Sequence, residues 1–564
     1  MTDQQPPTGP QDPTPPVDPR WDAPLPGETP TQPQYGQPPA YGAPPAHGAP
    51  PSQQPVYGQP GPGEQPYAQQ SPYGDVVATA APKSKRGLAL GGGALALALV
   101  AGGGLYFASQ ASDGGGDQPE TLVPSTAFAF ARIDLDPAPD QKVAIHEFAS
   151  KFPEGPKTDA KDPIDAILSD MFKKEGLGAC SYEADIKPWL GKRLGLAAIT
   201  GASGKTEPLV VVQVKDADKA KAAIAKLDSA ECASGDAGSD DDKDDLKGSS
   251  FKDGYLVMST TQADVDAALE AAKTKSLKGS GTFDDDVAKL DGSQVIVMWA
   301  DLARSFDAAA KQSPELNQIP NGIAKQLKGR VVMGLHMGNN YGELSGRIIG
   351  ADMSTVTVSS PVNLAKLPKA TVIAASVNGV QEQIEKQLSQ LGAAGASLDD
   401  MLAAVNGQLG LDVRKELLPL LGSTTTLSLG NVPTSPADAQ FGLQSTVTDP
   451  AAAAKTGTKL KELAEAQGIP LDAEVDGTTF YLTSKGYAAT LKGDGGLASS
   501  PTFSAAMGEL GDQVSGAVFV DVGQLSKAAP KGRGAKEIEH ISAFGMSAGK
   551  VGDDGYVRIR LVVK

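Results

Sequence analysis

Residue types that commonly build metal and catalytic sites are scarce in this chain. Its 564 residues include two cysteines and four histidines, which are His47, His146, His336 and His540. None of the histidines has the spacing of zinc ligands. His146-Glu147 begins an H-E-x-x-H pattern, but Ser150 stands where the second ligand is needed. We therefore expect no metal ion and no other cofactor.

Two patterns resemble catalytic motifs but lack the surroundings that the motifs need. Ser547 lies in a G-x-S-x-G pattern, yet no histidine follows it, and a β-type run follows where the motif requires a helix. Residues 199–206 resemble a phosphate-binding loop, but Ile199 replaces the first glycine. We predict no catalytic residues, and we interpret His336 as a hydrogen-bonded core residue.

Basic residues are also fewer than acidic ones: the chain has 50 basic and 67 acidic residues and a net charge of −17. Residues 1–86 hold four basic and seven acidic residues, and residues 87–109 hold no charge, so 46 basic and 60 acidic residues remain after them. A region with a charge of −14 repels phosphate backbones. Nucleic acid is therefore not an expected partner.

Phenylalanine is absent from residues 1–86, which hold 23 of the 43 prolines. Such a segment buries too little apolar surface to offset the entropy of its chain. We predict a disordered, Pro/Gly/Gln/Tyr-rich cytoplasmic tail over residues 1–86. Tyr-Gly-x-Pro repeats run through it, and two roles stay open, a docking tail for a partner and a spacer.

The stretch Gly87–Phe107 holds 21 residues without a charge. About 20 apolar residues span the hydrocarbon core of a bilayer as a helix, so we predict a transmembrane helix over residues 87–108. Lys83, Lys85 and Arg86 precede it, and basic residues favour the cytoplasmic side. We therefore predict a single-pass plasma-membrane protein with a cytoplasmic N-terminus and an extracellular C-terminal region.

A flexible linker is expected over residues 109–120, where serine and glycine are frequent. Within the apolar stretch, Ala94, Ala98 and Gly102 form a small-xxx-small pattern. Such patterns let two membrane helices pack closely, so a homodimer is possible.

After residue 121 the same order of β-type and helix-type runs occurs twice. Asp253-Gly254 and Asp476-Gly477 each separate two alternating apolar runs, the pattern of a type I′ hairpin. Thr282-Phe283 recurs 220 residues later as Thr502-Phe503. We predict an α+β fold of two tandem duplicated modules, 121–352 and 361–564, with largely antiparallel sheets and flanking helices.

Both cysteines, Cys180 and Cys232, lie in the first predicted module. An extracellular location favours a disulfide between them, and two free thiols are the alternative. The acidic run 234–245 follows Cys232 but lacks the spacing of an EF-hand loop, which indicates a solvated loop.

Five aspartates each follow a β-type run and precede a helix-type run. They are Asp134, Asp216, Asp301, Asp449 and Asp521. A carboxylate at this position accepts the free N–H groups of the first helical turn. We predict that all five are helix caps and not acid–base residues.

Three segments, VPSTAFAFARIDL from Val123, KPWLGKRLGLA from Lys187 and FKDGYLVMST from Phe251, resemble a bacterial family known as domain of unknown function 3352. The resemblance covers about residues 120–564. It implies a single-pass membrane protein and brings no activity, substrate or catalytic residue.

Together these features favour a membrane-anchored extracytoplasmic protein that binds or senses a cell-envelope component or a protein partner, without catalysis. Two alternatives stay open. One is a carrier or chaperone for a lipid or peptide, which requires a large apolar cavity. The other is an envelope hydrolase with an unrecognised site, which requires a pocket of converging charged side chains.

Overall fold

The computed structural model describes residues 118–136, 139–152, 165, 168–169, 180–227, 246–312, 328–354, 356–358, 363–393, 398–435, 438–493, 495–511, 513–528 and 538–564. The predicted tail, the predicted transmembrane helix at 87–108, most of the predicted linker and the acidic run lie outside these residues.

The prediction of a membrane-spanning helix is not borne out. No helix in the described ranges is long and apolar enough to cross a bilayer. The longest of them, α11 (Pro450–Ala466), has 17 residues and carries several lysines and glutamates, which the hydrocarbon core disfavours. The plasma-membrane location that depended on this helix is therefore not supported by the described residues.

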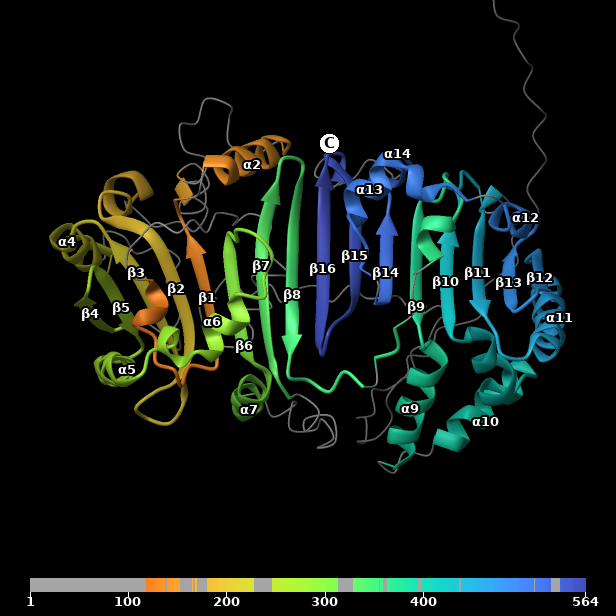
Figure 1. The fold of residues 1–564 in the computed structure, drawn as a ribbon, viewed down its shortest axis with the longest axis horizontal. Helices are drawn as coiled ribbons and strands as arrows, with labels where there is room; N and C mark the ends of the chain where they lie inside the picture. The colour runs from red at the N-terminus through yellow and green to blue at the C-terminus, as the bar shows by residue number, and fades with distance from the viewer. Residues whose placement is uncertain are drawn as a thin grey trace, which may run out of the picture. The chain divides into compact units, whose positions relative to one another are not determined.

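The described residues form an α+β fold built on one antiparallel sheet of 16 strands (Figure 1). The N-terminal half of the sheet contains β1 (Ala129–Asp134), β2 (Leu190–Thr200), β3 (Thr206–Val214), β4 (Gly248–Lys252), β5 (Tyr255–Ser259), β6 (Ile296–Asp301), β7 (Arg330–Gly338) and β8 (Tyr341–Ile349). The C-terminal half contains β9 (Ile373–Asn378), β10 (Thr424–Leu429), β11 (Phe441–Thr446), β12 (Leu471–Asp476), β13 (Thr479–Ser484), β14 (Val514–Val520), β15 (Ile541–Val551) and β16 (Asp554–Val563).

The strand order is the same when it is counted inward from either edge of the sheet. From one edge it is β4-β5-β3-β2-β1-β6-β7-β8, and from the other β12-β13-β11-β10-β9-β14-β15-β16. The halves meet at the seam, the antiparallel pairing of β8 with β16 in the middle of the sheet (Figure 1). Leu344 and Ile559 pair there, and each also pairs with the equivalent residue of its own hairpin, Leu335 or Met546. The seam is therefore symmetric about the Leu344–Ile559 pair.

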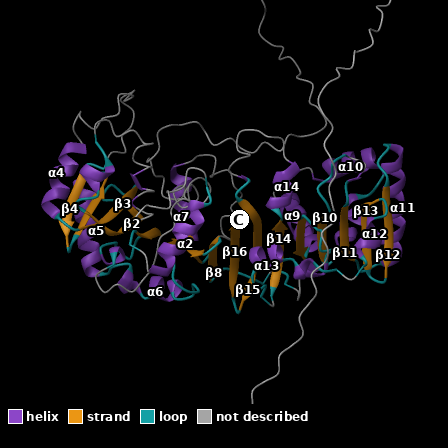
Figure 2. Cartoon of the chain, turned by 90° about the horizontal axis from the view of Figure 1, so that it is seen from above, coloured by secondary structure: helices purple, strands orange, loops and turns teal. Residues whose placement is uncertain are grey.

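The helices lie against both faces of the sheet (Figure 2). The longer ones are α2 (Pro139–Ser150), α4 (Ala217–Leu227), α5 (Gln262–Thr274), α6 (Thr282–Val287), α7 (Leu302–Gln312), α9 (Val380–Ala393), α10 (Leu398–Leu409), α11, α12 (Tyr487–Leu491), α13 (Pro501–Met507) and α14 (Val522–Ala528). The short turns that matter below are η3 (Tyr182–Ile186), η6 (Asn363–Lys366) and η7 (Val413–Leu417).

Equivalent aromatic pairs anchor the two halves of the core. Phe283 of α6 meets Trp299 edge to face, with ring centroids 6.0 Å apart. Phe503 of α13 meets Phe519 in the same way at 5.1 Å. All four side chains are buried, and edge-to-face contact adds to their apolar burial. The Thr-Phe pattern of the sequence thus marks the residue that joins a short helix to the sheet.

Equivalent capped turns also recur. In η3, Ser181 caps the turn and Asp185 accepts its backbone N–H, while Lys226 of α4 donates to Asp185 at 2.6 Å. In η7, Asp412 caps the turn, Glu416 accepts its N–H, and Lys459 of α11 donates to Glu416 at 2.5 Å. One ion pair therefore joins a helix, α4 or α11, to the capped turn of its half.

The first Asp-Gly hairpin turns as predicted. Asp253 has φ of 49° and Gly254 has φ of 78°, and two successive residues with positive φ define a type I′ turn. The second hairpin turns one residue later than predicted, because Asp476 still pairs with Thr479 as part of β12. Gly477, with φ of 58°, and Thr478 therefore form that turn.

The two halves are not separate units, because Ser84–Lys564 groups as one compact body. The structure shows corresponding topology in the halves, while the duplication itself and the module limits 121–352 and 361–564 stay predictions.

Cys180 lies directly before η3 and is buried. No cysteine of the described residues is free. Cys232, its predicted partner, lies outside those residues. No disulfide with both of its cysteines is therefore described, and the Cys180–Cys232 bridge is not confirmed.

Candidate functional site

Four of the five strand-end aspartates cap helices as predicted. Each accepts the backbone N–H three residues on, at 2.8–3.1 Å: Asp216 at α4, Asp301 at α7, Asp449 at α11 and Asp521 at α14. Their carboxylates are therefore engaged by helix N-termini, which explains their position without catalysis.

Asp134 differs from the other four. Its carboxylate accepts the N–H of Asp136 at 3.0 Å, in the turn before α2 and not at the helix itself. It is 6% exposed, and burial raises its pKa from 3.8 to about 6, against the opposing effects of that hydrogen bond and of Arg193. A carboxyl with a raised pKa binds protons more tightly in the folded than in the unfolded protein. Its ionisation therefore costs stability as the pH rises from about 4 to about 6.

Replacing Asp134 with asparagine is expected to stabilise the protein at pH 7 by up to about 3 kcal/mol, since each pKa unit corresponds to about 1.4 kcal/mol. The difference should be smallest near pH 3, where Asp134 is largely protonated in both the folded and the unfolded state. Urea unfolding of both proteins from pH 3 to 7.5 measures the difference. A difference that is constant over this range would contradict a raised pKa.

The catalytic look-alikes are structural features. Ser547 is 3% exposed within β15, and a Cβ at Gly545 would lie 2.2 Å from the carbonyl oxygen of Ala506. The G-x-S-x-G pattern thus lets α13 approach the strand.

The phosphate-loop look-alike and His336 are also structural. Gly201–Lys205 forms the turn of the β2–β3 hairpin, so no helix N-terminus follows it. His336 is half-buried and its Nδ1 lies 3.0 Å from the carbonyl oxygen of Ser293, which confirms a hydrogen-bonded residue but not a fully buried one.

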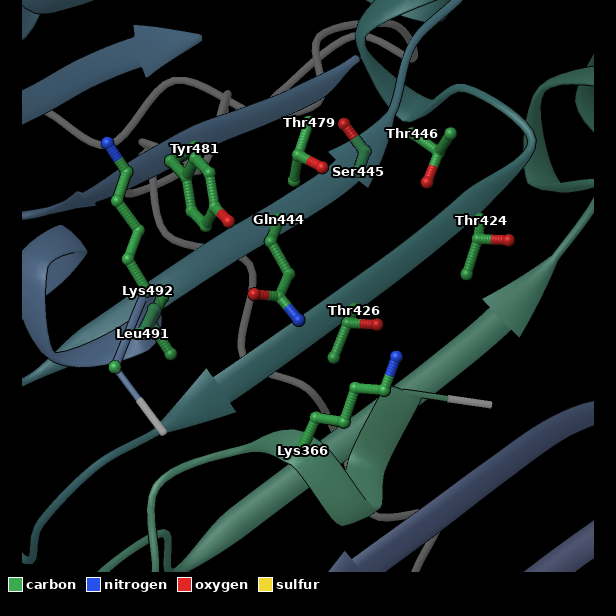
Figure 3. Close-up of a pocket in the computed structure, with 11 residues that line it drawn as sticks. Lys366, Thr424, Thr426, Gln444, Ser445, Thr446, Thr479, Tyr481, Leu491 and Lys492 are labelled. Atoms are coloured by element: carbon green, nitrogen blue, oxygen red, sulfur yellow. The ribbon is translucent and has the colours of Figure 1, made fainter. Parts of the chain in front are cut away.

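The strongest candidate site is a pocket of about 290 Å³ on one face of the sheet in the C-terminal half (Figure 3). We call it the polar-face pocket. Its floor is formed by β10, β11 and β13, and its rim by η6 and α12. The lining residues are Lys366, Thr424, Thr426, Gln444, Ser445, Thr446, Thr479, Tyr481, Leu491, Lys492 and Gly493.

Alternation along the strands explains why polar residues share this face. Side chains two residues apart point to the same side of a strand, so Thr424 and Thr426 lie together on β10. Thr426 pairs with Gln444, and Gln444 pairs with Tyr481. The three side chains form one row across three strands, while Phe480, on the opposite face, packs in the core beneath α11.

The same position in the N-terminal half is filled. There the row is Gly195, Val211 and Val257, and both valines are fully buried. Val265 of α5 packs in the same core cluster. The 13 residues of α5 thus cover the face that stays open in the C-terminal half, where α12 has five residues.

The threonine hydroxyls in the pocket floor are held from the neighbouring strand β9. Thr424 donates to Asn378 at 2.9 Å, and the hydroxyl of Thr426 lies 2.9 Å from that of Ser376. In contrast, no hydrogen bond within the described structure engages the side-chain amide of Gln444. Burial, with a smaller effect of Asp476, raises the pKa of Tyr481, so its phenol keeps its proton at neutral pH.

The two lysines of the rim differ in their partners. Lys492 pairs with Glu474 at 3.0 Å and lies 5.3 Å from the ring centre of Tyr481. Lys366 is exposed, and none of the described carboxylates lies within ion-pair distance of it. Lys366 therefore brings a positive charge to the pocket that the described carboxylates do not neutralise.

A second pocket, of about 170 Å³, lies in the N-terminal half and includes Asp136, Asp165, Lys187 and Lys192. Lys187 pairs with Asp165 at 3.0 Å, and Lys192 pairs with Asp136. Hydrogen bonds to Asp165 and Glu183 raise the pKa of Lys187. Burial raises the pKa of Asp136, but the hydrogen bonds from Lys142 and Lys192 outweigh it and lower that pKa. Both groups thus keep their charges at neutral pH, which does not suit acid–base catalysis.

Across the described part of the chain, no group of three histidine, cysteine or acidic side chains could hold a metal ion. The polar-face pocket has no carboxylate in its lining, so the lining offers hydrogen bonds and positive charge. The sequence analysis predicted none of the residues that line the polar-face pocket. The pattern that indicates them is the replacement of Val211 and Val257 by Gln444 and Tyr481 in otherwise matching strands.

Comparison with known proteins gives one result. The sequence profile of the family described as a protein of unknown function, DUF3352, matches residues 90–479. No curated protein matches the chain, and no solved structure does. The match covers more than half of the 564 residues, and the chain therefore belongs to the DUF3352 family.

Proposed function

We propose that this protein is a non-enzymatic binding protein whose ligand occupies the polar-face pocket. The observation that carries the proposal is the difference between the halves, since equivalent strands are covered by α5 in one half and left open beside α12 in the other. An open face with inward hydroxyl, amide and ammonium groups suits a polar ligand.

The lining of the pocket weighs against a lipid carrier and against a hydrolase. A carrier for a lipid requires an apolar lining, whereas Leu491 and the Tyr481 ring are the main apolar surfaces of this pocket. Most hydrolases use a histidine or a carboxylate as acid or base, and the lining contains neither.

The test is a screen of polar metabolites by ligand-observed NMR on the full chain and on its Gln444→Trp variant. Gln444 is half-exposed, so tryptophan there should fill the pocket without entering the core. Gln383→Trp, on the exposed side of α9, is the matched control. We expect at least one compound whose binding is lost in Gln444→Trp and kept in the control. If every binder persisted in Gln444→Trp, or none were found, the proposal would fail.

We also infer that the two halves arose by duplication of one unit. The matching strand order, the equivalent aromatic pairs and the equivalent ion pairs of Lys226 and Lys459 support this inference. In this interpretation the first half kept a closed face, and the second half lost most of a helix and gained a binding surface.

A further inference from the structure

We propose that the ligand of the polar-face pocket is an acidic saccharide of one or two sugar units, bound through its hydroxyls and one anionic group. This inference rests on the proposed function above, and adds the chemical class of the ligand. It follows from three properties of the pocket, namely its charge, its hydrogen-bonding groups and its size.

The charge of the pocket favours a single anionic group. The lining holds two lysines and no acidic residue, and Glu474 outside the lining engages Lys492. Lys366 stands on the opposite rim, across the row from Tyr481 (Figure 3). A carboxylate or phosphate near Lys366 would form a charge-assisted hydrogen bond, which is stronger than a neutral one.

The hydrogen-bonding groups suit several hydroxyls on one ligand. Gln444 offers a donor and an acceptor, Thr446 and Thr479 offer hydroxyls that act as either, and Tyr481 offers a protonated phenol. These groups come from two adjacent strands, β11 and β13, in directly paired positions. Neighbouring hydroxyls of a sugar ring present the same alternation of donors and acceptors, so one ring could contact several of these groups together.

The small volume and the small apolar surface of the pocket exclude larger or more apolar ligands. The volume of about 290 Å³ lies at the lower limit of small-molecule sites, which are typically about 300–1,000 Å³. Leu491 and the ring of Tyr481 supply a limited apolar contact, enough for the C–H face of a sugar and too little for an acyl chain.

Calorimetric titration of the full chain tests the ligand class with three probes: glucuronate, glucose 6-phosphate and neutral glucose. We expect both acidic sugars to bind about tenfold more tightly than glucose, with an affinity that falls as salt rises. Lys366→Gln should remove this preference and leave the weak binding of glucose. Lys369→Gln is the control, because Lys369 is exposed three residues away and does not line the pocket.

The outcomes separate the ligand class from the proposed function. Equal binding of glucose and the acidic sugars, or an unchanged preference in Lys366→Gln, would overturn the acidic class. If none of the three sugars bound, the inference that the ligand is a saccharide would be overturned. In either case, other metabolites that bind in a Gln444-dependent way would leave the proposed function intact. Binding of the acidic sugars that survives in Gln444→Trp would place them outside the pocket and overturn the inference.

Discussion

Replacing Asp286 with alanine is expected to lower the free energy of unfolding by about 3 kcal/mol, because it breaks an ion pair with the partly exposed Arg330 and leaves a buried indole N–H without an acceptor. Asp286 is 1% exposed. One carboxylate oxygen accepts the indole N–H of Trp299 at 2.8 Å and the Nε–H of Arg330 at 2.6 Å, and the other accepts from the Arg330 guanidinium at 2.9 Å. The alanine variant would leave both donors unpaired beneath α6.

Asp285 provides the matched control, because it lies on the same helix and is exposed. Asp285→Ala should change stability by less than about 0.5 kcal/mol, as surface substitutions generally do. Asp286→Asn keeps the shape of the side chain, so its loss of stability should lie between those of Asp286→Ala and Asp285→Ala. Urea unfolding of the three variants is the measurement, and a loss below 1 kcal/mol in Asp286→Ala would contradict the expected cost of the unpaired donors.

The second large effect is expected at the seam. Glu343 of β8 accepts two hydrogen bonds from Arg560 of β16, at 2.8 and 2.5 Å. The Arg560 guanidinium also lies 4.2 Å from the ring centre of Tyr341. Both side chains of the ion pair are less than one fifth exposed. Glu343→Ala should therefore cost about 2–4 kcal/mol, somewhat below the value for a fully buried pair.

The double variant Glu343→Leu with Arg560→Met tests the origin of this loss. Apolar side chains of similar size often replace a buried pair at little cost, so the double variant should recover most of the stability that Glu343→Ala loses. Glu509→Ala, at an exposed carboxylate near the seam, is the control and should be neutral. If the double variant were as unstable as Glu343→Ala, packing and not the unpaired charge would explain the effect.

Local features of the fold could be predicted from the sequence because local chemistry determines them. Asp216, Asp301, Asp449 and Asp521 cap helices because a short acceptor before a helix satisfies its first N–H groups. Asp253-Gly254 turns as type I′ because both residues accept positive φ. Asp134 departs from this pattern, since Pro139 starts α2 three residues after the turn that Asp134 closes.

The seam and the pocket depend on distant contacts and could not be predicted in this way. No local pattern in β8 indicates that its partner strand begins more than 200 residues later, at Asp554. The pocket depends on the length of α12, because a longer helix would cover Gln444 and Tyr481 as α5 covers Val211 and Val257. Matching the two halves residue by residue shows the polar replacements, but only the sheet brings them into one row.

The seam also affects how the chain is made. Translation proceeds at about 5–20 residues per second, and domains fold as they emerge. Synthesis of the residues between β8 and β16 therefore takes roughly 10–40 s. During that interval β8 is a bare edge, open to pairing with the same strand of a neighbouring nascent chain. Glu343 and Arg347 place opposite charges on that edge. An antiparallel encounter of two β8 strands could satisfy both charges, so the nascent first half is a natural point for chaperone binding and for domain-swapped dimers.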